Sequence, residues 1–368
     1  MGRTEETITA RRFFDGHSIH GPVRVTLSGG VVSSVEDHDG DCEHELLSPG
    51  LVDLQVNGWA GVDFASSDED DLRRLDGELA ALGTTSYLAT LISDRLDRMS
   101  DRTALLAESS PLLPGMLGVH LEGPFLGRVT GAHRRDRVVP VDVRWLRTLP
   151  GNVRLVTLGA EQDGAAEAVD VLGSRGVTVS IGHSAPGVDD YERAVTAGAR
   201  MVTHLFNAMS GVHHREFGLA LAALTDRRVA LGLIADMHHV SPRAVALAFA
   251  ARPDAVCLVS DSVAWESPAF VRMGARIVNG APRLVDGTLA GSSTSLAECV
   301  GRVVRECGTS LETVLRAATS VPAGLVGATE AGRIMTGRPC DIVAFDGDLC
   351  VRAVWRRLVS SRGNPTDD

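Results

Sequence analysis

The chain has 368 residues, which is enough for one large domain or two ordinary ones. Its formal net charge of −11 argues against a nucleic-acid partner or an anionic-membrane surface, and its 44% hydrophobic content is ordinary for a globular enzyme. All 36 residues counted as Lys or Arg are arginines. The chain therefore has no lysine for a Schiff base, a P-loop or a metal bridge made by a modified lysine.

The beginning of the chain and its cysteines bear on location. Residues 1–10 are polar and contain no apolar segment of the kind that a secretory signal needs. The six cysteines form no C-x-x-C pair, and no apolar run approaches the roughly 18 residues of a membrane-spanning helix. We therefore expect reduced thiols, a cytoplasmic protein and no membrane partner.

Short strands separated by turn signals are predicted at both ends of the chain. The N-terminal runs are 8–14, 23–27 and 31–35, and strand patterns return at 341–345 and 351–358. We predict that residues 1–48 and 331–362 pair as a small β-sandwich domain.

The pattern changes between these two ends, where apolar strand-like runs alternate with stretches of helical period. The eight runs are 51–58, 84–91, 116–123, 153–160, 177–184, 201–208, 229–236 and 255–262. Near-continuous apolar runs are typical of strands buried on both faces of a parallel sheet. Helices are predicted between the runs, for example at 68–82, 188–197 and 242–251, and a hairpin is predicted within 263–290. Eight such units predict a (β/α)8 TIM barrel over residues 49–330.

Polar side chains stand at the ends of several predicted strands. Glu122, His183, His204 and Asp261 end the third, fifth, sixth and eighth runs. Because the C-terminal ends of barrel strands meet at one rim, these groups are predicted to lie together. One Glu and two His form a three-ligand set for a divalent metal such as Zn²⁺, with a fourth position left for water and Asp261 placed to act as a base. Taken singly, each is more often a hydrogen-bonded core or rim residue than a ligand.

Several motifs resemble those of known enzymes. Residues 49–58, PGLVDLQVNG, resemble the start of the barrel in the amidohydrolase superfamily, with Gln55 and Asn57 where most members carry His-x-His. Six further motifs resemble those of the N-acetylglucosamine-6-phosphate deacetylase family. They are HLEGPF at 120–125, GAH at 131–133, GHS at 182–184, THLFNAM at 203–209, D-x-x-H at 236–239 and GTLAGSS at 287–293. These motifs follow the family order and cover nearly the whole chain.

The resemblance implies roles for individual residues. Glu122, His183 and His204 would hold the metal, Asp261 would be the catalytic acid and base, and His133 would contact the substrate near the metal. The remaining substrate contacts would come from Gln55, Asn57, Ala132, Asn207, Ala208, Arg215, His239, Leu289, Ala290 and Gly291. The implied reaction is hydrolysis of N-acetylglucosamine 6-phosphate to glucosamine 6-phosphate and acetate.

The metal count and the assembly follow from the same comparison. Neutral amides are poorer Zn²⁺ ligands than imidazole, so Gln55 and Asn57 predict one metal per subunit, zinc first, with Fe²⁺, Mn²⁺ or Co²⁺ as alternatives. The family position of Arg215 implies a homodimer in which this arginine reaches the neighbouring site and its phosphate. From the residues alone, Arg215 is more simply a solvated surface side chain.

The sequence also departs from the family pattern around the substrate. Phe217 stands where a proline is usual, and Trp265 and Glu266 follow Asp261. Trp265 either stacks on a sugar, narrows the acyl pocket or packs within its loop. Two alternative functions therefore stay open. One is deacylation of a related N-acyl amino sugar, phosphorylated or not, and the other is non-catalytic sensing of a sugar phosphate.

Overall fold

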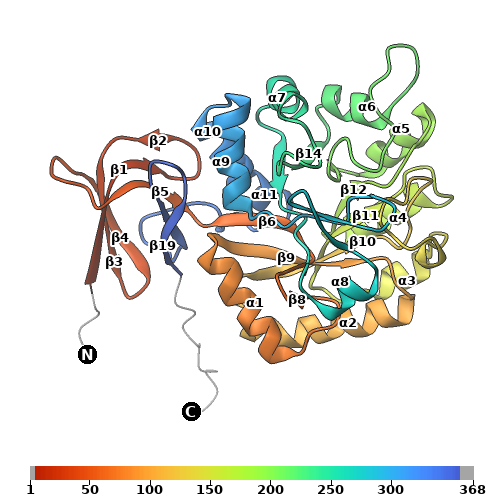
Figure 1. Cartoon of the computed structure of the whole chain (residues 1–368), viewed down its shortest axis with the longest axis horizontal. Coiled ribbons are helices and arrows are strands. Elements are labelled where there is room, and N and C mark those ends of the chain that lie inside the picture. The colour runs from red at the N-terminus through yellow and green to blue at the C-terminus, as the bar shows by residue number, and fades with distance from the viewer. Residues whose placement is uncertain (1–4, 357–368) are drawn as a thin grey trace.

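The computed structural model describes residues 5–356. It places a small β-rich unit beside a larger unit of strands and helices (Figure 1). Residues 1–4 and 357–362 of the predicted small domain lie outside the described residues, and its exact boundaries stay a prediction.

Both ends of the chain build the small unit. Its seven-stranded sheet has the order β19-β18-β5-β1-β3-β4, with β2 paired to β1. The strands are β1 (Glu5–Phe14), β2 (Ile19–His20), β3 (Val23–Ser28), β4 (Val31–Asp37), β5 (His44–Pro49), β18 (Ile342–Phe345) and β19 (Val351–Trp355). Alternate residues such as Val23 and Val25 turn inward and share a core with Ile342 and Ala344. The prediction that the N- and C-terminal segments form one small β domain is confirmed.

The larger unit is a barrel of eight parallel strands. They are β6 (Leu51–Val56), β9 (Thr84–Ile92), β10 (Met116–Glu122), β11 (Val153–Leu158), β12 (Thr178–Ile181), β13 (Met201–Val202), β14 (Ala230–Ile234) and β15 (Val256–Val259). A bridge between Val56 and Ser262 joins the first strand to the segment that follows the last. The predicted TIM barrel is confirmed, and each of its eight strands overlaps one predicted run.

Helices cover the outside of this barrel (Figure 1). They are α1 (Glu69–Ala81), α2 (Leu96–Ser109), α3 (Val143–Thr148), α4 (Ala165–Ser174), α5 (Val188–Ala197), α6 (Leu219–Thr225), α7 (Pro242–Ala251), α9 (Leu296–Cys307), α10 (Leu311–Ala317) and α11 (Ser320–Leu325). Helix α1 shows why they form: the Asp68 carboxylate caps its first turn, and Leu72, Leu75 and Leu79 turn one apolar face to the core. No helix among the described residues is both long and apolar enough to span a bilayer.

Two short insertions flank the open end of the barrel. The first is the hairpin β7 (Gly58–Trp59) and β8 (Val62–Asp63). The second contains α8 (Pro268–Arg272) and the predicted hairpin, β16 (Arg276–Val278) and β17 (Ala281–Arg283). Asn279 and Gly280 have φ values of 52° and 79°, as a tight two-residue hairpin turn requires.

Candidate active site

Four chemically active side chains are delivered by the C-terminal ends of four barrel strands. Glu122 is the last residue of β10, and His183, His204 and Asp261 each lie two residues beyond the end of β12, β13 and β15. These three residues have positive φ values of 49°, 28° and 49°. Left-handed backbone is uncommon for residues with a side chain and costs free energy, and such residues gather at functional sites. Each of these four strands therefore ends at the side chain that carries the chemistry or two residues before it.

Three ligand atoms converge on one point. Glu122 Oε1 lies 3.1 Å from His183 Nε2 and 3.0 Å from His204 Nε2, and the two nitrogens are 3.1 Å apart. The three side chains are almost completely buried. Ligand atoms about 2.0–2.2 Å from a tetrahedral zinc ion are roughly 3.3–3.6 Å from one another, which is close to this spacing. The arrangement is the right size for a single small cation.

Hydrogen bonding supports the same interpretation. His183 Nδ1 lies 3.2 Å from the carbonyl oxygen of Val129, to which it donates. Its Nε2 faces the Glu122 carboxylate, so a ring nitrogen and a carboxylate oxygen meet at this point while the other ring nitrogen is already engaged. Among residues 5–356, the Nδ1 atom of His204 is buried without a hydrogen-bond partner. A divalent cation would satisfy the lone pairs that meet at this point.

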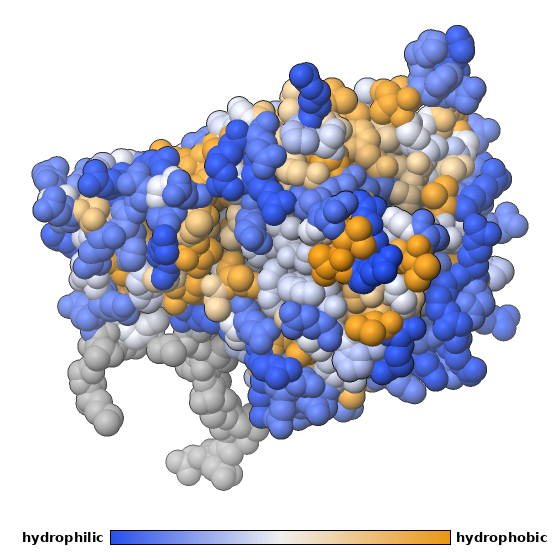
Figure 2. Space-filling model, viewed as in Figure 1, coloured by the Kyte–Doolittle hydropathy of each residue, from blue (hydrophilic) through white to orange (hydrophobic). Residues whose placement is uncertain are grey.

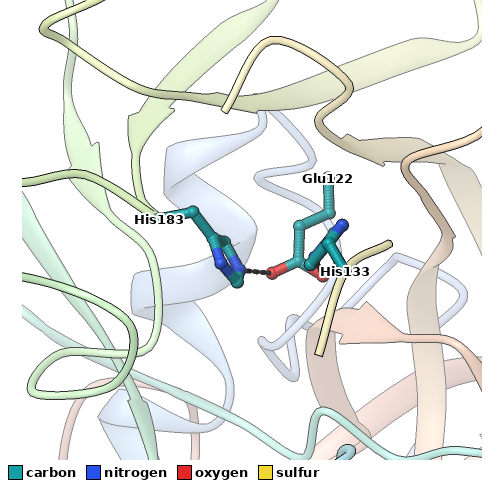
Figure 3. A group of neighbouring side chains, drawn as sticks. All are labelled: Glu122, His133 and His183. Atoms are coloured by element: carbon teal, nitrogen blue, oxygen red, sulfur yellow. Dashed lines mark hydrogen bonds and ion pairs between the residues drawn. The ribbon is translucent and has the colours of Figure 1, made fainter. Parts of the chain in front are cut away.

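His133 lies beside this group and is the alternative to His204 as the third ligand. One ligand atom from each of Glu122, His133 and His183 lies within 4.8 Å of the other two (Figure 3). However, His133 Nε2 is 3.8 Å from Glu122 Oε2, farther than His204 Nε2 is from Oε1. Its Nδ1 accepts from the backbone N–H of Ser93 at 3.4 Å, which leaves the proton on Nε2. Burial and the neighbouring histidines lower the pKa of His133 to about 3, so the ring is a neutral donor.

Two amides hold the carboxylate of Asp261. Asn57 Nδ2 donates to its Oδ1 at 2.9 Å, and Gln55 Nε2 donates to the same oxygen at 3.0 Å. Gln55 Nε2 also donates to Glu122 Oε1 at 3.0 Å, so one amide links both carboxylates. Burial and the negative charge of Glu122 raise the pKa of Asp261 to about 7. A carboxyl group with such a pKa can both accept and return a proton near neutral pH.

All four groups open into one cavity of about 410 Å³. The predicted site residues that line it are Asn57, Glu122, Ala132, His133, His183, His204, Asn207, Ala208, His239, Asp261, Leu289, Ala290 and Gly291. Gln55 is buried behind this surface. Of the predicted set, only Gln55 and Arg215 are missing from the lining of this cavity in the described part of the chain.

Two further residues support the histidines of the site. Ser93 Oγ lies 2.9 Å from His133 Nδ1, and Asp236 Oδ2 lies 2.7 Å from His239 Nδ1. Burial opposes ionisation of Asp236, but its hydrogen bond with His239 holds the pKa of this carboxyl at about 2. Asp236 therefore fixes the ring of His239 at the cavity wall. The D-x-x-H spacing at 236–239 carried this signal, whereas nothing in the sequence marked Ser93.

The departures from the family pattern lie mostly outside the cavity. Trp265 packs edge-on against Trp59 with ring centroids 4.6 Å apart, which favours the packed-loop interpretation. Phe217 packs against Tyr191, and both line a separate surface hollow. Arg215 is exposed, and its backbone N–H lies 3.4 Å from His213 Nδ1.

A barrel whose rim gathers histidines and carboxylates around a cation-sized point belongs to the class of barrel enzymes suited to metal-assisted chemistry, hydrolysis included. Residues 46–364 match the amidohydrolase family. The chain is 35% identical over 344 residues to N-acetylglucosamine-6-phosphate deacetylase of Caenorhabditis elegans, covering 86% of this chain and 82% of the relative. It is 30% identical to N-acetylgalactosamine-6-phosphate deacetylase of Escherichia coli O157:H7, covering 96% and 97%.

A solved structure agrees with these relatives. It is an N-acetyl-D-glucosamine-6-phosphate deacetylase mutant from Mycobacterium smegmatis in complex with N-acetyl-D-glucosamine-6-phosphate, with a TM-score of 0.88 and 27% identity. The match covers 96% of this chain and 98% of that one. The chain belongs to the amidohydrolase family and, within it, to the family of N-acetylglucosamine-6-phosphate deacetylases.

Proposed function

We propose that the chain hydrolyses N-acetylglucosamine 6-phosphate to glucosamine 6-phosphate and acetate. The observation that carries this proposal is the convergence of Glu122, His183 and His204 beside Asp261 and His133 in one cavity of a chain from this family. The 30% identical E. coli relative favours a second candidate, the epimeric N-acetylgalactosamine 6-phosphate.

The residues fit one divalent metal ion per subunit, with zinc as the first choice and Fe²⁺, Mn²⁺ or Co²⁺ as alternatives. Glu122, His183 and His204 would hold it, because their buried ligand atoms converge within 3.1 Å of one another. When bound, such an ion polarises an acyl carbonyl and acidifies water. Gln55 and Asn57 are engaged as donors to the carboxylates, which argues against a second metal at the first strand.

Asp261 and His133 supply the proton chemistry in this proposal. The carboxylate of Asp261 takes a proton from the attacking water and later gives it to the nitrogen of the departing amine. The N–H of His133 Nε2 donates to the oxygen of the acyl group as negative charge develops there. Asn57 and Gln55 hold Asp261 in place throughout, since both donate to Oδ1.

The other cavity residues would bind the amino sugar and its phosphate. Asn207, Ala208 and His239 follow the sixth and seventh strands, and Leu289, Ala290 and Gly291 provide backbone beside them. We propose that Arg215 acts on the neighbouring site of a homodimer, because it is exposed and does not line the cavity of its own chain. A phosphorylated substrate also favours a cytoplasmic location.

Acetate release from a panel of N-acetyl sugars, measured together with bound metal, tests the proposal. We expect turnover of N-acetylglucosamine 6-phosphate, slower turnover of its unphosphorylated form, and about one divalent ion per chain. Chelation should abolish activity, and added Zn²⁺ should restore it. Tight binding of the phosphosugar without any acetate release would favour the sensor alternative instead.

Asp261→Asn separates proton transfer from metal binding. We expect kcat to fall at least 100-fold because the amide cannot accept a proton, while the metal content stays near that of the wild type. Metal analysis and acetate release on the same preparation measure both. Near-full activity of this variant would contradict the role of Asp261.

A further inference from the structure

One wall of the active-site cavity is mainly apolar, with Asp63, Ser66 and Ser267 from the same segments also in the lining. Ala65 follows β8, Ile92 ends β9, and Ala269, Phe270 and Met273 belong to α8 and its C-terminal end. We call these five residues the apolar wall. Ile92 and Met273 keep 40% and 49% of their surface exposed, although both border the cavity. Figure 2 shows apolar side chains gathered on the face where α8 lies in Figure 1.

The barrel topology places one residue of this wall, Ile92, opposite two of the proposed sugar contacts. In the strand order of the sheet, β9 is the second strand and β13 is the sixth. Second and sixth strands face each other across an eight-stranded barrel. Ile92 at the end of β9 therefore lies across the barrel mouth from Asn207 and Ala208, which follow β13.

The geometry of the substrate's amide bond determines which part of the substrate faces the apolar wall. An amide is planar and trans, so the sugar on its nitrogen and the carbon chain on its carbonyl leave in opposite directions. With the carbonyl beside Glu122 and Asp261 and the sugar toward Asn207 and Ala208, the acyl chain leaves toward Ile92 and the side of the cavity that it borders. An acetyl group ends in a single methyl and so offers little apolar surface to this side of the cavity, where Ile92 and Met273 remain partly exposed.

We propose that this enzyme accepts amino-sugar phosphates whose N-acyl group is an unbranched chain longer than acetyl, and that the apolar wall binds this chain. The inference rests on the proposed function, because it uses the same carbonyl position. The wall is firmly built: Phe270 packs with Ala275 and Ala290, and Ala132 and Trp265 pack against that cluster. The Ser267 hydroxyl also caps α8 by accepting from the N–H of Phe270 at 3.1 Å.

The test compares kcat/KM for N-acetyl-, N-butyryl- and N-hexanoyl-glucosamine 6-phosphate on the wild-type enzyme. Each buried methylene strengthens binding by up to about fourfold, so we expect kcat/KM for the butyryl substrate to exceed that for acetyl by roughly tenfold. In Ala269→Leu, a larger side chain fills the space, and the butyryl-to-acetyl ratio should fall at least tenfold. Ile92→Asn, at a half-exposed position, is a second variant that should lower the same ratio.

Val271→Leu is the matched control, because Val271 lies on α8, is 63% exposed and does not line the cavity. Its butyryl-to-acetyl ratio should equal that of the wild type. If the acetyl substrate is cleaved and kcat/KM falls with chain length, the inference is wrong while the proposed function stands. If neither substrate is cleaved, the proposed function fails and the inference fails with it. Equal losses for both substrates in Ala269→Leu and Ile92→Asn would refute the wall as the acyl site.

Discussion

Asp53 is a buried carboxyl group that lies behind the site. It lies on β6, and its carboxylate accepts from the backbone N–H of Gln55 at 3.1 Å and from that of Ser260 at 3.2 Å. Burial dominates these hydrogen bonds and raises the pKa of Asp53 to about 6. The carboxyl therefore joins the first and last strands directly behind Gln55 and Asp261, and it does so at the expense of stability near neutral pH.

Asp53→Asn should change the pH dependence of stability. The folded-state pKa lies above the unfolded value of 3.8, so the wild type loses stability as the pH rises from about 4 to 6 and remains penalised above that. The amide of the variant keeps one acceptor but carries no charge. We expect the stability of the Asp53→Asn variant, relative to that of the wild type, to rise by about 3 kcal/mol between about pH 4 and pH 7.5, measured by urea unfolding. A difference between the two proteins that is independent of pH would contradict this.

At the scale of elements, α1 connects the two units of the chain. Asp76 on this helix is buried and accepts from Tyr87 Oη on β9 at 3.0 Å and from the N–H of Gly115 before β10 at 2.9 Å. It also pairs with Arg356 Nη1 at 2.6 Å, just after β19 of the small sheet. One carboxylate thus ties a barrel helix to two barrel strands and to the terminal sheet.

Asp76→Ala should destabilise the fold without altering the chemistry. It leaves a buried hydroxyl and a buried N–H without an acceptor, which we expect to cost about 1–3 kcal/mol in the free energy of unfolding. Asp70→Ala on the same helix is the control, because Asp70 is 92% exposed and its ion pair with Arg73 contributes little. Thermal or urea unfolding measures both variants. A loss no larger than that of Asp70→Ala would argue against this connection.

The strands and helices also show how much of the fold and of the site could be predicted from sequence patterns. All eight barrel strands were predictable because burial on both faces gives continuous apolar runs. Their ends were not: the sixth run was predicted over 201–208, but β13 stops at Val202. There His204, Phe206 and Ala208 adopt positive φ, and hydropathy carries no information on that. Likewise the strand ends indicated Glu122, His183, His204 and Asp261, whereas Ser93 reaches His133 only through the folding of a loop.

For the whole molecule, the central question is where Arg215 acts. Arg215 is exposed and does not line the cavity of its own chain. Its neighbours His213 and His214 are half-buried and exposed, respectively. If Arg215 serves a partner's site, a symmetric dimer exchanges two arginines across its two-fold axis. The catalytic carboxylate and the phosphate ligand of each site would then belong to different chains.

Mixing two defective variants measures this arrangement. Asp261→Asn lacks the proton acceptor, and Arg215→Ala should raise the KM for the phosphosugar because a bidentate phosphate contact is lost. In heterodimers formed from equal amounts, one site of two regains both residues, so about a quarter of all sites should recover wild-type kinetics. Activity assays at low phosphosugar concentration detect this recovery. Mixtures no more active than the sum of the separate variants would place Arg215 outside the neighbouring site.

The contacts that close the barrel, between its first strand and the segment after its last, also carry active-site residues. Asp261 N–H donates to the Gln55 carbonyl at 2.9 Å, and Asn57 N–H donates to the Ser262 carbonyl at 2.8 Å. These contacts join the first strand to the segment after the last, and the Gln55–Asp261 side chains are 206 positions apart in the chain. Contacts between such distant segments require the largest loop closure and form slowly. A refolding chain should therefore regain its helices before its turnover, and enzyme activity reports the moment at which the barrel closes.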